Sequence, residues 1–261
     1  MQYLLGIDSD GTLRHSDGTI SLKTKQILKS IISDGNIIVI CTARPRYHIL
    51  KISKEIGTIQ YLISSNGTEI FDSINNKIIW GTYLSFCNCK KIYEDTLKLD
   101  LRAIFVCENI EYVTKFTRNN SQILLDEQKI NELFSKNIKQ IMIIDKDRNK
   151  IAMYQNIVKN KYHLNVVDTS NINKEEVWFS IINENASKGN ALKHLAEYLN
   201  IPDSNIIAIG NDNNDISMIK IAKIGVAMGN STSQLKKEAN VITKTNDEDG
   251  VYHFLKNCIQ K

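Results

Sequence analysis

Residues 3–12 read YLLGIDSDGT, and they carry the clearest indication of the fold in this chain. Its first half, residues 3–7, is a short apolar run, which predicts a buried β-strand. Two acids follow at once, Asp8 and Asp10, and Gly11 then provides the backbone freedom that a turn requires. Because ligands of open α/β sheets bind where the parallel strands end, this pattern predicts an α/β fold with its chemistry at a strand tip.

Outward from this stretch, short runs rich in Ile and Val alternate with amphipathic stretches at helical spacing. The alternation covers the N-terminal part of the chain and resumes after Ser187, and it is typical of β-α units around a parallel sheet. The expected strands are 3–7, 36–41, 61–64, 205–209 and 224–228, with a hairpin at 69–80. The expected helices are 22–33, capped by Ser21, then 46–56, 189–199 and 214–221. The predicted fold class is therefore α/β, a Rossmann-like three-layer core with a parallel sheet.

The middle of the chain has a different pattern. Strand-like runs at 102–107 and 140–144, and further strands around Val166 and Val177, are separated by helical stretches. This predicts an inserted α+β module. The expected domains are a core formed by residues 1–81 and 185–261 and an insertion formed by residues 82–184.

Composition and charge limit the classes of function. The 261 residues are 42% hydrophobic and 24% charged, as in ordinary globular chains, and the net charge is +4. A charge this small on scattered lysines predicts neither nucleic-acid nor membrane-surface binding, and it suits a small anionic ligand. No apolar run reaches the roughly 18 residues of a spanning helix, and no basic leader precedes the first strand, so we expect a cytoplasmic protein. The cysteines are unevenly spaced and predict reduced thiols, and the close pair Cys87 and Cys89 lacks the second Cys/His pair of a zinc site.

The first candidate site is the acid pair itself. Asp8 and Asp10 stand two residues apart, so both can converge on one cation, and Mg²⁺ prefers oxygen ligands of this kind. Such a cation would keep Asp8 ionised and screen it from an incoming phosphate dianion, which suits a carboxylate nucleophile. The alternative is that the two acids only form a turn, but unpaired charges against a buried strand would be costly.

Three further candidate places follow other predicted strands or begin a helix. Thr42 and the backbone N–H groups after it, including that of Ala43, could hold phosphate oxygens, although Thr42 would also serve as a helix N-cap. Lys188, followed by Gly189, could neutralise a phosphoryl group, although a lone lysine is usually solvated. The loop 210–215, rich in acids and amides, could complete a cation site, although it could also be a polar turn.

Taken in this order, the four places resemble the motifs of the haloacid dehalogenase superfamily, in particular its Cof-like phosphatases of class IIB, over nearly the whole chain. Residues 8–12 are similar to the Asp-x-Asp-Gly-Thr signature of that family, and Ser65-Asn66-Gly67 is similar to the Asn-Gly turn after its third strand. Residues 82–184 resemble the α/β cap domain in which these proteins set substrate specificity. The second, third and fourth motifs of the family are matched by Thr42, by Lys188-Gly189 and by the loop 210–215.

The resemblance implies a role for each candidate residue. Asp8 would attack phosphorus, while Asp10 would protonate the leaving oxygen and later deprotonate the hydrolytic water. The phosphoryl group would be held by Thr42, Ala43, Lys188 and Asn214. Magnesium would be held by Asp8, the backbone carbonyl of Asp10 and Asn211, with Asp212 and Asp215 behind them or as alternative ligands. The expected activity is Mg²⁺-dependent hydrolysis of small phosphomonoesters, sugar phosphates or phosphorylated cofactors, through an aspartyl phosphate on Asp8.

One position departs from the family pattern, which is Gly-Asp-x-x-Asn-Asp in the fourth motif. This chain has Asn211 where the first of those acids belongs, so we expect weaker Mg²⁺ affinity unless Asp212 or Asp215 turns inward. The missing charge also leaves open the alternative that the chain is a catalytically silent module, which binds a phosphorylated metabolite without converting it. Among enzymes, a phosphomutase or phosphotransferase on the same fold remains the alternative.

The sequence leaves the substrate open, because the resemblance places specificity in cap side chains whose positions do not follow from spacing. The basic residues Lys115, Arg118 and Lys146 could face the leaving group, although exposure to solvent is the usual fate of such side chains. The expected partner is a small phosphorylated metabolite. The oligomeric state, a monomer or a weak homo-oligomer, does not follow from the sequence.

Overall fold

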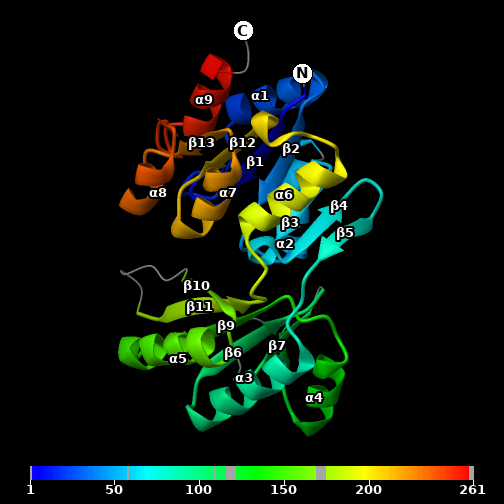
Figure 1. The fold of residues 1–261 in the computed structure, drawn as a ribbon, viewed down its shortest axis with the longest axis vertical. Helices are drawn as coiled ribbons and strands as arrows, with labels where there is room; N and C mark the ends of the chain where they lie inside the picture. Colours follow the sequence, from blue (N-terminus) through cyan, green and yellow to red (C-terminus); the bar gives the residue numbers. More distant parts are fainter. Residues whose placement is uncertain (1, 58, 109, 116–121, 169–174, 259–261) are drawn as a thin grey trace. The chain divides into compact units, whose positions relative to one another are not determined.

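The computed structural model describes residues 2–57, 59–108, 110–115, 122–168 and 175–258 (Figure 1). The chain divides into two compact units, one formed by Met1–Gly81 with Ser187–Lys261 and the other by Thr82–Ala186. Each unit has its own sheet and its own hydrophobic core. The two segments of the first unit, far apart in sequence, build one sheet.

The described part of the first unit contains an eight-stranded sheet in the order β14-β13-β12-β1-β2-β3-β4-β5. Its strands from β14 to β3 are parallel, and β4 and β5 extend it as an antiparallel hairpin. The strands are β1 (Leu4–Asp8), β2 (Ile37–Cys41), β3 (Tyr61–Ser64), β4 (Glu69–Asp72), β5 (Lys77–Gly81), β12 (Ile206–Gly210), β13 (Ile224–Ala227) and β14 (Val241–Ile242).

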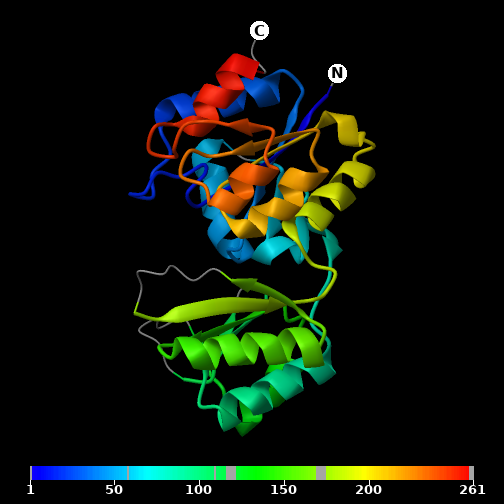
Figure 2. The ribbon, with the colours of Figure 1, turned by 60° about the vertical axis from the view of Figure 1, so that its left-hand side comes forward.

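Helices cover both faces of this sheet (Figures 1 and 2). Successive residues of a strand point to opposite faces, so Leu5 packs in one core with residues of α1, α2 and α9, and Leu4 packs in another with residues of α6, α7 and α8. Both leucines are fully buried. The helices are α1 (Leu22–Ser33), α2 (Arg46–Ile56), α6 (Lys188–Tyr198), α7 (Ile216–Ile221), α8 (Ser233–Glu238) and α9 (Gly250–Cys258). The predicted three-layer α/β core is confirmed.

Local signals set most of the element boundaries in this unit. The Ser21 side chain accepts a hydrogen bond from the backbone N–H of Thr24, and α1 has the predicted bounds. Helix α6 begins one residue earlier than expected, because Ser187 caps it by accepting from the N–H of Asn190. The helix expected at 214–221 is instead a 3₁₀ turn, Asn213–Asp215, followed by α7.

The second unit is an α+β module, as its alternating pattern predicted. Its described strands lie in the order β10-β11-β9-β6-β7-β8, antiparallel except for the β7–β8 pair. The strands β7 and β8 were not expected, because each has only three residues. Its elements are α3 (Phe86–Lys98), β6 (Arg102–Val106), β7 (Glu111–Val113), β8 (Gln122–Leu124), α4 (Glu127–Phe134), β9 (Gln140–Asp145), α5 (Arg148–Lys161), β10 (Asn165–Asp168) and β11 (Val177–Ile182).

Among the described residues, no helix combines the length and the apolar character needed to cross a membrane. The cysteines Cys87 and Cys89 lie in α3, the first exposed and the second buried. Within the same described ranges, no group of three or more His, Cys, Asp or Glu side chains is arranged to hold a metal ion.

Candidate active site

The carboxyl ends of three neighbouring strands bring the sequence motifs together. In the parallel register, Asp8 of β1 pairs with Cys41 of β2, and Ile7 pairs with Ile209 of β12. The loops that leave these strands therefore start from one edge of the sheet, as ligand sites of open α/β sheets do. They carry Asp8 and its following turn, Thr42, and the fourth-motif residues that follow β12.

Lys188, the first residue of α6, joins two of these loops. Its Nζ lies 2.7 Å from Asp8 Oδ1 and 2.6 Å from Asp215 Oδ1. Only 1% of the Lys188 side chain is exposed, and Asp215 is fully buried. A buried ammonium with two charge-assisted hydrogen bonds is far from the solvated lysine that spacing alone allowed.

The charges of this triad shift each other's pKa. Burial raises the pKa of Asp8, the charge of Asp215 raises it further, and Lys188 lowers it, so that it lies at about 7 instead of 3.8. Burial alone would lower the pKa of Lys188, but the charges and hydrogen bonds of Asp215 and Asp8 outweigh this and raise it above its ordinary value. Lys188 therefore stays protonated at neutral pH and provides a fixed positive charge beside Asp8.

Asp215 also fixes the loop after β12. Its Oδ2 accepts hydrogen bonds from the backbone N–H groups of Asn211 at 2.9 Å and of Asp212 at 3.0 Å. Asp212 in turn caps the 3₁₀ turn by accepting from the N–H of Asn213. One oxygen of Asp215 thus contacts Lys188 and the other accepts from two backbone N–H groups, while Asp212 caps the turn. Neither of these two carboxylates turns inward to replace the charge that is missing at Asn211.

The side-chain amide of Asn211 instead faces the turn after β1. Its inward-facing atom lies 3.0 Å from Asp8 Oδ2, 3.1 Å from the carbonyl oxygen of Asp10 and 2.9 Å from Thr12 Oγ1. Octahedral Mg²⁺ with ligands at 2.0–2.1 Å has neighbouring oxygens about 3.0 Å apart. A carboxylate and a carbonyl oxygen, each at about this distance from the amide, thus suit a small hard cation when the amide presents its oxygen to them.

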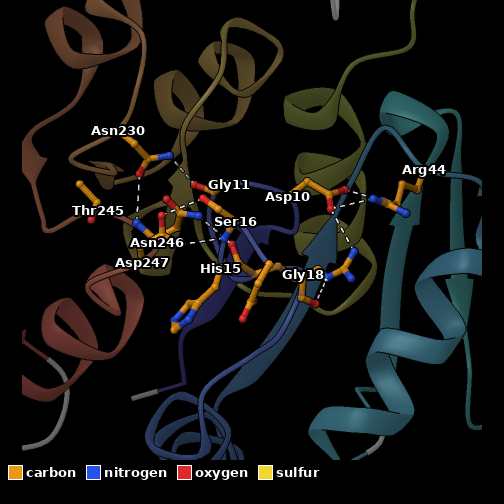
Figure 3. Close-up of a pocket in the computed structure, with 12 residues that line it drawn as sticks. Asp10, Gly11, His15, Ser16, Gly18, Arg44, Asn230, Thr245, Asn246 and Asp247 are labelled. Carbon is orange, nitrogen blue, oxygen red and sulfur yellow. Dashed lines mark hydrogen bonds and ion pairs between the residues drawn. The ribbon is translucent and has the colours of Figure 1, made fainter. Parts of the chain in front are cut away.

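The carboxylate of Asp10 points elsewhere. Figure 3 shows it turned toward Arg44, which contacts both of its oxygens, and Arg14 adds a third bond at 3.1 Å. These residues line a polar cavity of about 640 Å³ that also includes Asn230 and Asn246. Asp10 thus directs its backbone carbonyl toward Asn211 and its side chain into this cavity.

The predicted phosphate-binding residues lie around the same strand tips. Thr42 is buried, and its hydroxyl accepts from the N–H of Arg44 at 3.2 Å, while Ala43 between them is half-buried. The Asn214 amide nitrogen donates to Asn66 Oδ1 at 3.1 Å. With Lys188, they supply the hydroxyl, amide and ammonium groups that bind phosphate oxygens.

Asn66 is a residue to which the sequence assigned only a turn. It has a left-handed backbone, with φ 59° and ψ 29°, and its N–H donates to the carbonyl of Thr42 at 3.0 Å. Gly67 follows with φ +91°, and a Cβ there would lie 2.1 Å from the carbonyl oxygen of Ser187, just before Lys188. The turn therefore contacts the second, third and fourth motifs and connects them. The Asn-Gly pair was the sequence signal that could have indicated this connecting role.

The basic residues considered in the second unit are engaged with local acids. Lys115 pairs with Asp100 at 2.5 Å and Lys146 with Glu175 at 2.5 Å, all four side chains being exposed. Arg118 lies outside the described residues. The expectation of solvent exposure thus holds for Lys115 and Lys146.

Comparisons with known proteins place this arrangement in a family. A sequence model of haloacid dehalogenase-like hydrolases matches residues 5–255. The putative phosphatase YxeH of Bacillus subtilis is 29% identical over 98% of this chain and 97% of its own. The 5-amino-6-(5-phospho-D-ribitylamino)uracil phosphatase YitU of the same organism is 26% identical over 97% of this chain and 96% of its own.

The solved structures agree with the sequence comparisons. A haloacid dehalogenase-like hydrolase from Bacteroides thetaiotaomicron superposes with a TM-score of 0.81 at 26% identity, covering 98% of this chain and 99% of the other. Full-length coverage means that both units of the chain have counterparts in that protein. The chain therefore belongs to the haloacid dehalogenase-like hydrolase family, as an enzyme of its Cof-like phosphatases.

Proposed function

We propose that this enzyme hydrolyses small phosphomonoesters with the help of Mg²⁺ and through an aspartyl phosphate on Asp8. The observation that carries the proposal is the contact of the Lys188 ammonium with Asp8 Oδ1 at 2.7 Å, buried at the tip of β1. A carboxylate there repels a phosphate dianion unless positive charge stands beside it. Lys188 supplies such a charge, and Asp215 holds it in position.

In the proposed reaction, a carboxylate oxygen of Asp8 attacks phosphorus and the ester P–O bond breaks. The leaving alkoxide takes a proton from Asp10, and the resulting carboxylate then accepts a proton from water, whose oxygen attacks the aspartyl phosphate. Inorganic phosphate leaves, and both acids return to their starting state. Thr42, Lys188 and Asn214 hold the phosphoryl oxygens during both steps.

Magnesium would be held by Asp8, the backbone carbonyl of Asp10 and the side-chain oxygen of Asn211, because the Asn211 amide lies 3.0 Å from Asp8 Oδ2 and 3.1 Å from the carbonyl oxygen of Asp10. When bound, it would offset negative charge on the transferring group and the nucleophile. Thr12 supports the site by its hydrogen bond to the Asn211 amide.

We propose a small phosphorylated metabolite as substrate, within the sugar phosphates and phosphorylated cofactors. The relative YitU is named for 5-amino-6-(5-phospho-D-ribitylamino)uracil, a small phosphorylated compound, which we include among the candidates. A phosphomutase or phosphotransferase differs by passing the phosphoryl group to a substrate hydroxyl instead of water. A silent binding module would keep the pocket without turnover.

A phosphomonoester panel that includes these classes, assayed for free phosphate with Mg²⁺ and with a chelator, tests the proposal. We expect Mg²⁺-dependent release, and a loss of at least roughly 10³-fold in Asp8→Asn. Asp34→Asn, a change of the same kind at the exposed end of α1, is the control and should keep full activity. Mass spectrometry after acid quenching should find phosphate on Asp8.

Each alternative predicts a different result. Migration of phosphate to another hydroxyl, without free phosphate, would identify a mutase or transferase. Binding of phosphomonoesters without turnover would identify the silent module. Full turnover in Asp8→Asn would show that another residue is the nucleophile.

A further inference from the structure

The amide of Asn211 occupies a position that suits either of its two polar atoms, depending on whether a cation is present. The inward-facing atom is 3.0 Å from Asp8 Oδ2 and 3.1 Å from the carbonyl oxygen of Asp10, both of which only accept hydrogen bonds when Asp8 is ionised. With the oxygen inward, three acceptors face one another, which requires a cation between them. With the nitrogen inward, the same contacts become hydrogen bonds.

The surroundings allow this exchange by rotation of the side-chain amide alone. The backbone of Asn211 is held on both sides, because its N–H donates to Asp215 at 2.9 Å and its carbonyl accepts from Thr232 at 3.0 Å. The hydroxyl of Thr12, 2.9 Å from the inward atom, donates to an amide oxygen or accepts from an amide nitrogen equally well. The other polar atom of the Asn211 amide, which faces away from Asp8, has room because residue 11 is a glycine. A Cβ on Gly11 would lie 2.5 Å from that atom.

We infer that Asn211 acts as a latch on the cation site: its nitrogen faces inward and closes the site when no cation is bound, and its oxygen faces inward as a ligand when one is. The inference rests on the proposed function, since it takes Mg²⁺ as the cation. A carboxylate at this position has no hydrogen to donate, so it could not close the site in this way.

The latch has a consequence for the order of binding. A cation binds Asp8 in its ionised form, and with Asp8 and Asp215 both ionised beside a protonated Lys188 the three buried side chains sum to one negative charge. A divalent cation makes the site positive by one charge, which favours a phosphate dianion, whereas an acid at position 211 would leave it neutral. Mg²⁺ should therefore bind weakly to the free enzyme and more tightly together with phosphate, and by linkage phosphate should bind more tightly with Mg²⁺.

Calorimetric titration of Mg²⁺, with and without inorganic phosphate, tests this on the full chain. We expect Asn211→Asp to bind Mg²⁺ alone at least roughly tenfold more tightly than the wild type, and to gain less from phosphate. Asn213→Asp adds the same charge two residues away, on an exposed residue of the same turn, and should behave like the wild type. Equal Mg²⁺ affinities of the wild type and Asn211→Asp, with phosphatase turnover intact, would overturn the latch alone.

A second measurement uses the wild type and so does not depend on how a variant folds. The side-chain NH₂ resonance of Asn211, assigned by its connectivity to the backbone amide, should exchange slowly with solvent without Mg²⁺. Saturating Mg²⁺ should shift it and speed the exchange, because the nitrogen turns away from Asp8. A resonance unchanged by saturating Mg²⁺ would overturn the latch, and no Mg²⁺ binding in any variant would overturn both the latch and the metal dependence proposed above.

Discussion

Arg44 binds both carboxylate oxygens of Asp10, through Nε to Oδ2 at 2.5 Å and through Nη2 to Oδ1 at 2.9 Å. The fork geometry of a guanidinium fixes the direction of a carboxylate as well as its position. Since Asp10 is the proposed acid and base, Arg44 sets the direction of the carboxylate that would exchange the proton. Arg44 belongs to the loop after β2 and Asp10 to the loop after β1, so this pair also joins two motifs.

Arg44→Lys should therefore lower kcat by about tenfold with a smaller change in KM, because lysine keeps the charge but cannot make the fork. Arg14→Lys is the matched control, since Arg14 makes only one bond to the same carboxylate, at 3.1 Å. Steady-state kinetics of both variants as a function of pH will measure this. Full activity in Arg44→Lys would mean that charge, and not the orientation given by the fork, is what Asp10 requires, and an equal loss in the two variants would mean that the fork of Arg44 has no special role.

Lys188→Met should abolish activity and lower the free energy of unfolding by about 3–5 kcal/mol, because it leaves Asp8 and Asp215 as uncompensated buried charges. The loss should be smaller at pH 5 than at pH 8, since the pKa of Asp8 is about 7 and its protonation removes the repulsion. Urea unfolding at pH 5 and pH 8 measures the loss of stability and its dependence on pH. Lys193→Met changes an exposed lysine of the same helix and should cost little. A stable Lys188→Met protein at pH 8 would contradict the electrostatic account of the triad.

Gly67→Ala should destabilise the enzyme far more than Gly35→Ala. Both glycines have positive φ, +91° and +83°, but the new Cβ would lie 2.1 Å from the Ser187 carbonyl oxygen at Gly67 and would contact nothing within 4 Å at Gly35. We expect about 1 kcal/mol for the backbone strain at Gly35 and about 4 kcal/mol or failure to fold at Gly67. Denaturant midpoints measure the difference. Similar losses would mean that the turn relaxes away from α6.

Asp249 should stabilise the fold in a pH-dependent manner. Burial alone would raise its pKa, but hydrogen bonds from Lys23, Ser21, His15 and Thr24 lower it from 3.8 to about 2. A lowered carboxyl pKa adds stability that is present above pH 3.8 and is lost as the pH falls through about 2. Asp249→Asn should thus cost about 1–2 kcal/mol at pH 7 and almost nothing at pH 2. Urea unfolding of both proteins across this range gives the answer, and a loss independent of pH would exclude the charge as its source.

Much of the fold follows from local patterns. The apolar run before Asp8 predicted β1, and Ser21 with the periodic residues after it predicted α1 to the residue. The spacing of hydrophobic residues and helix capping act over a few residues, so both can be recognised without knowledge of the rest of the chain. The short strands β7 and β8 were missed because their pairing depends on neighbours in space.

The order of residues along the chain is enough to predict which chemical groups stand at the strand tips: two acids after β1, a hydroxyl after β2, a lysine at the start of α6 and an amide-rich loop after β12. How these groups meet depends on the folded arrangement. It placed Lys188 against both Asp8 and Asp215, turned the Asp10 carboxylate toward Arg44, and set Asn66 against Asn214. Sheet register and core packing select these partners, and the pair Lys188–Asp8 lies 180 residues apart in sequence, a separation that no local pattern covers.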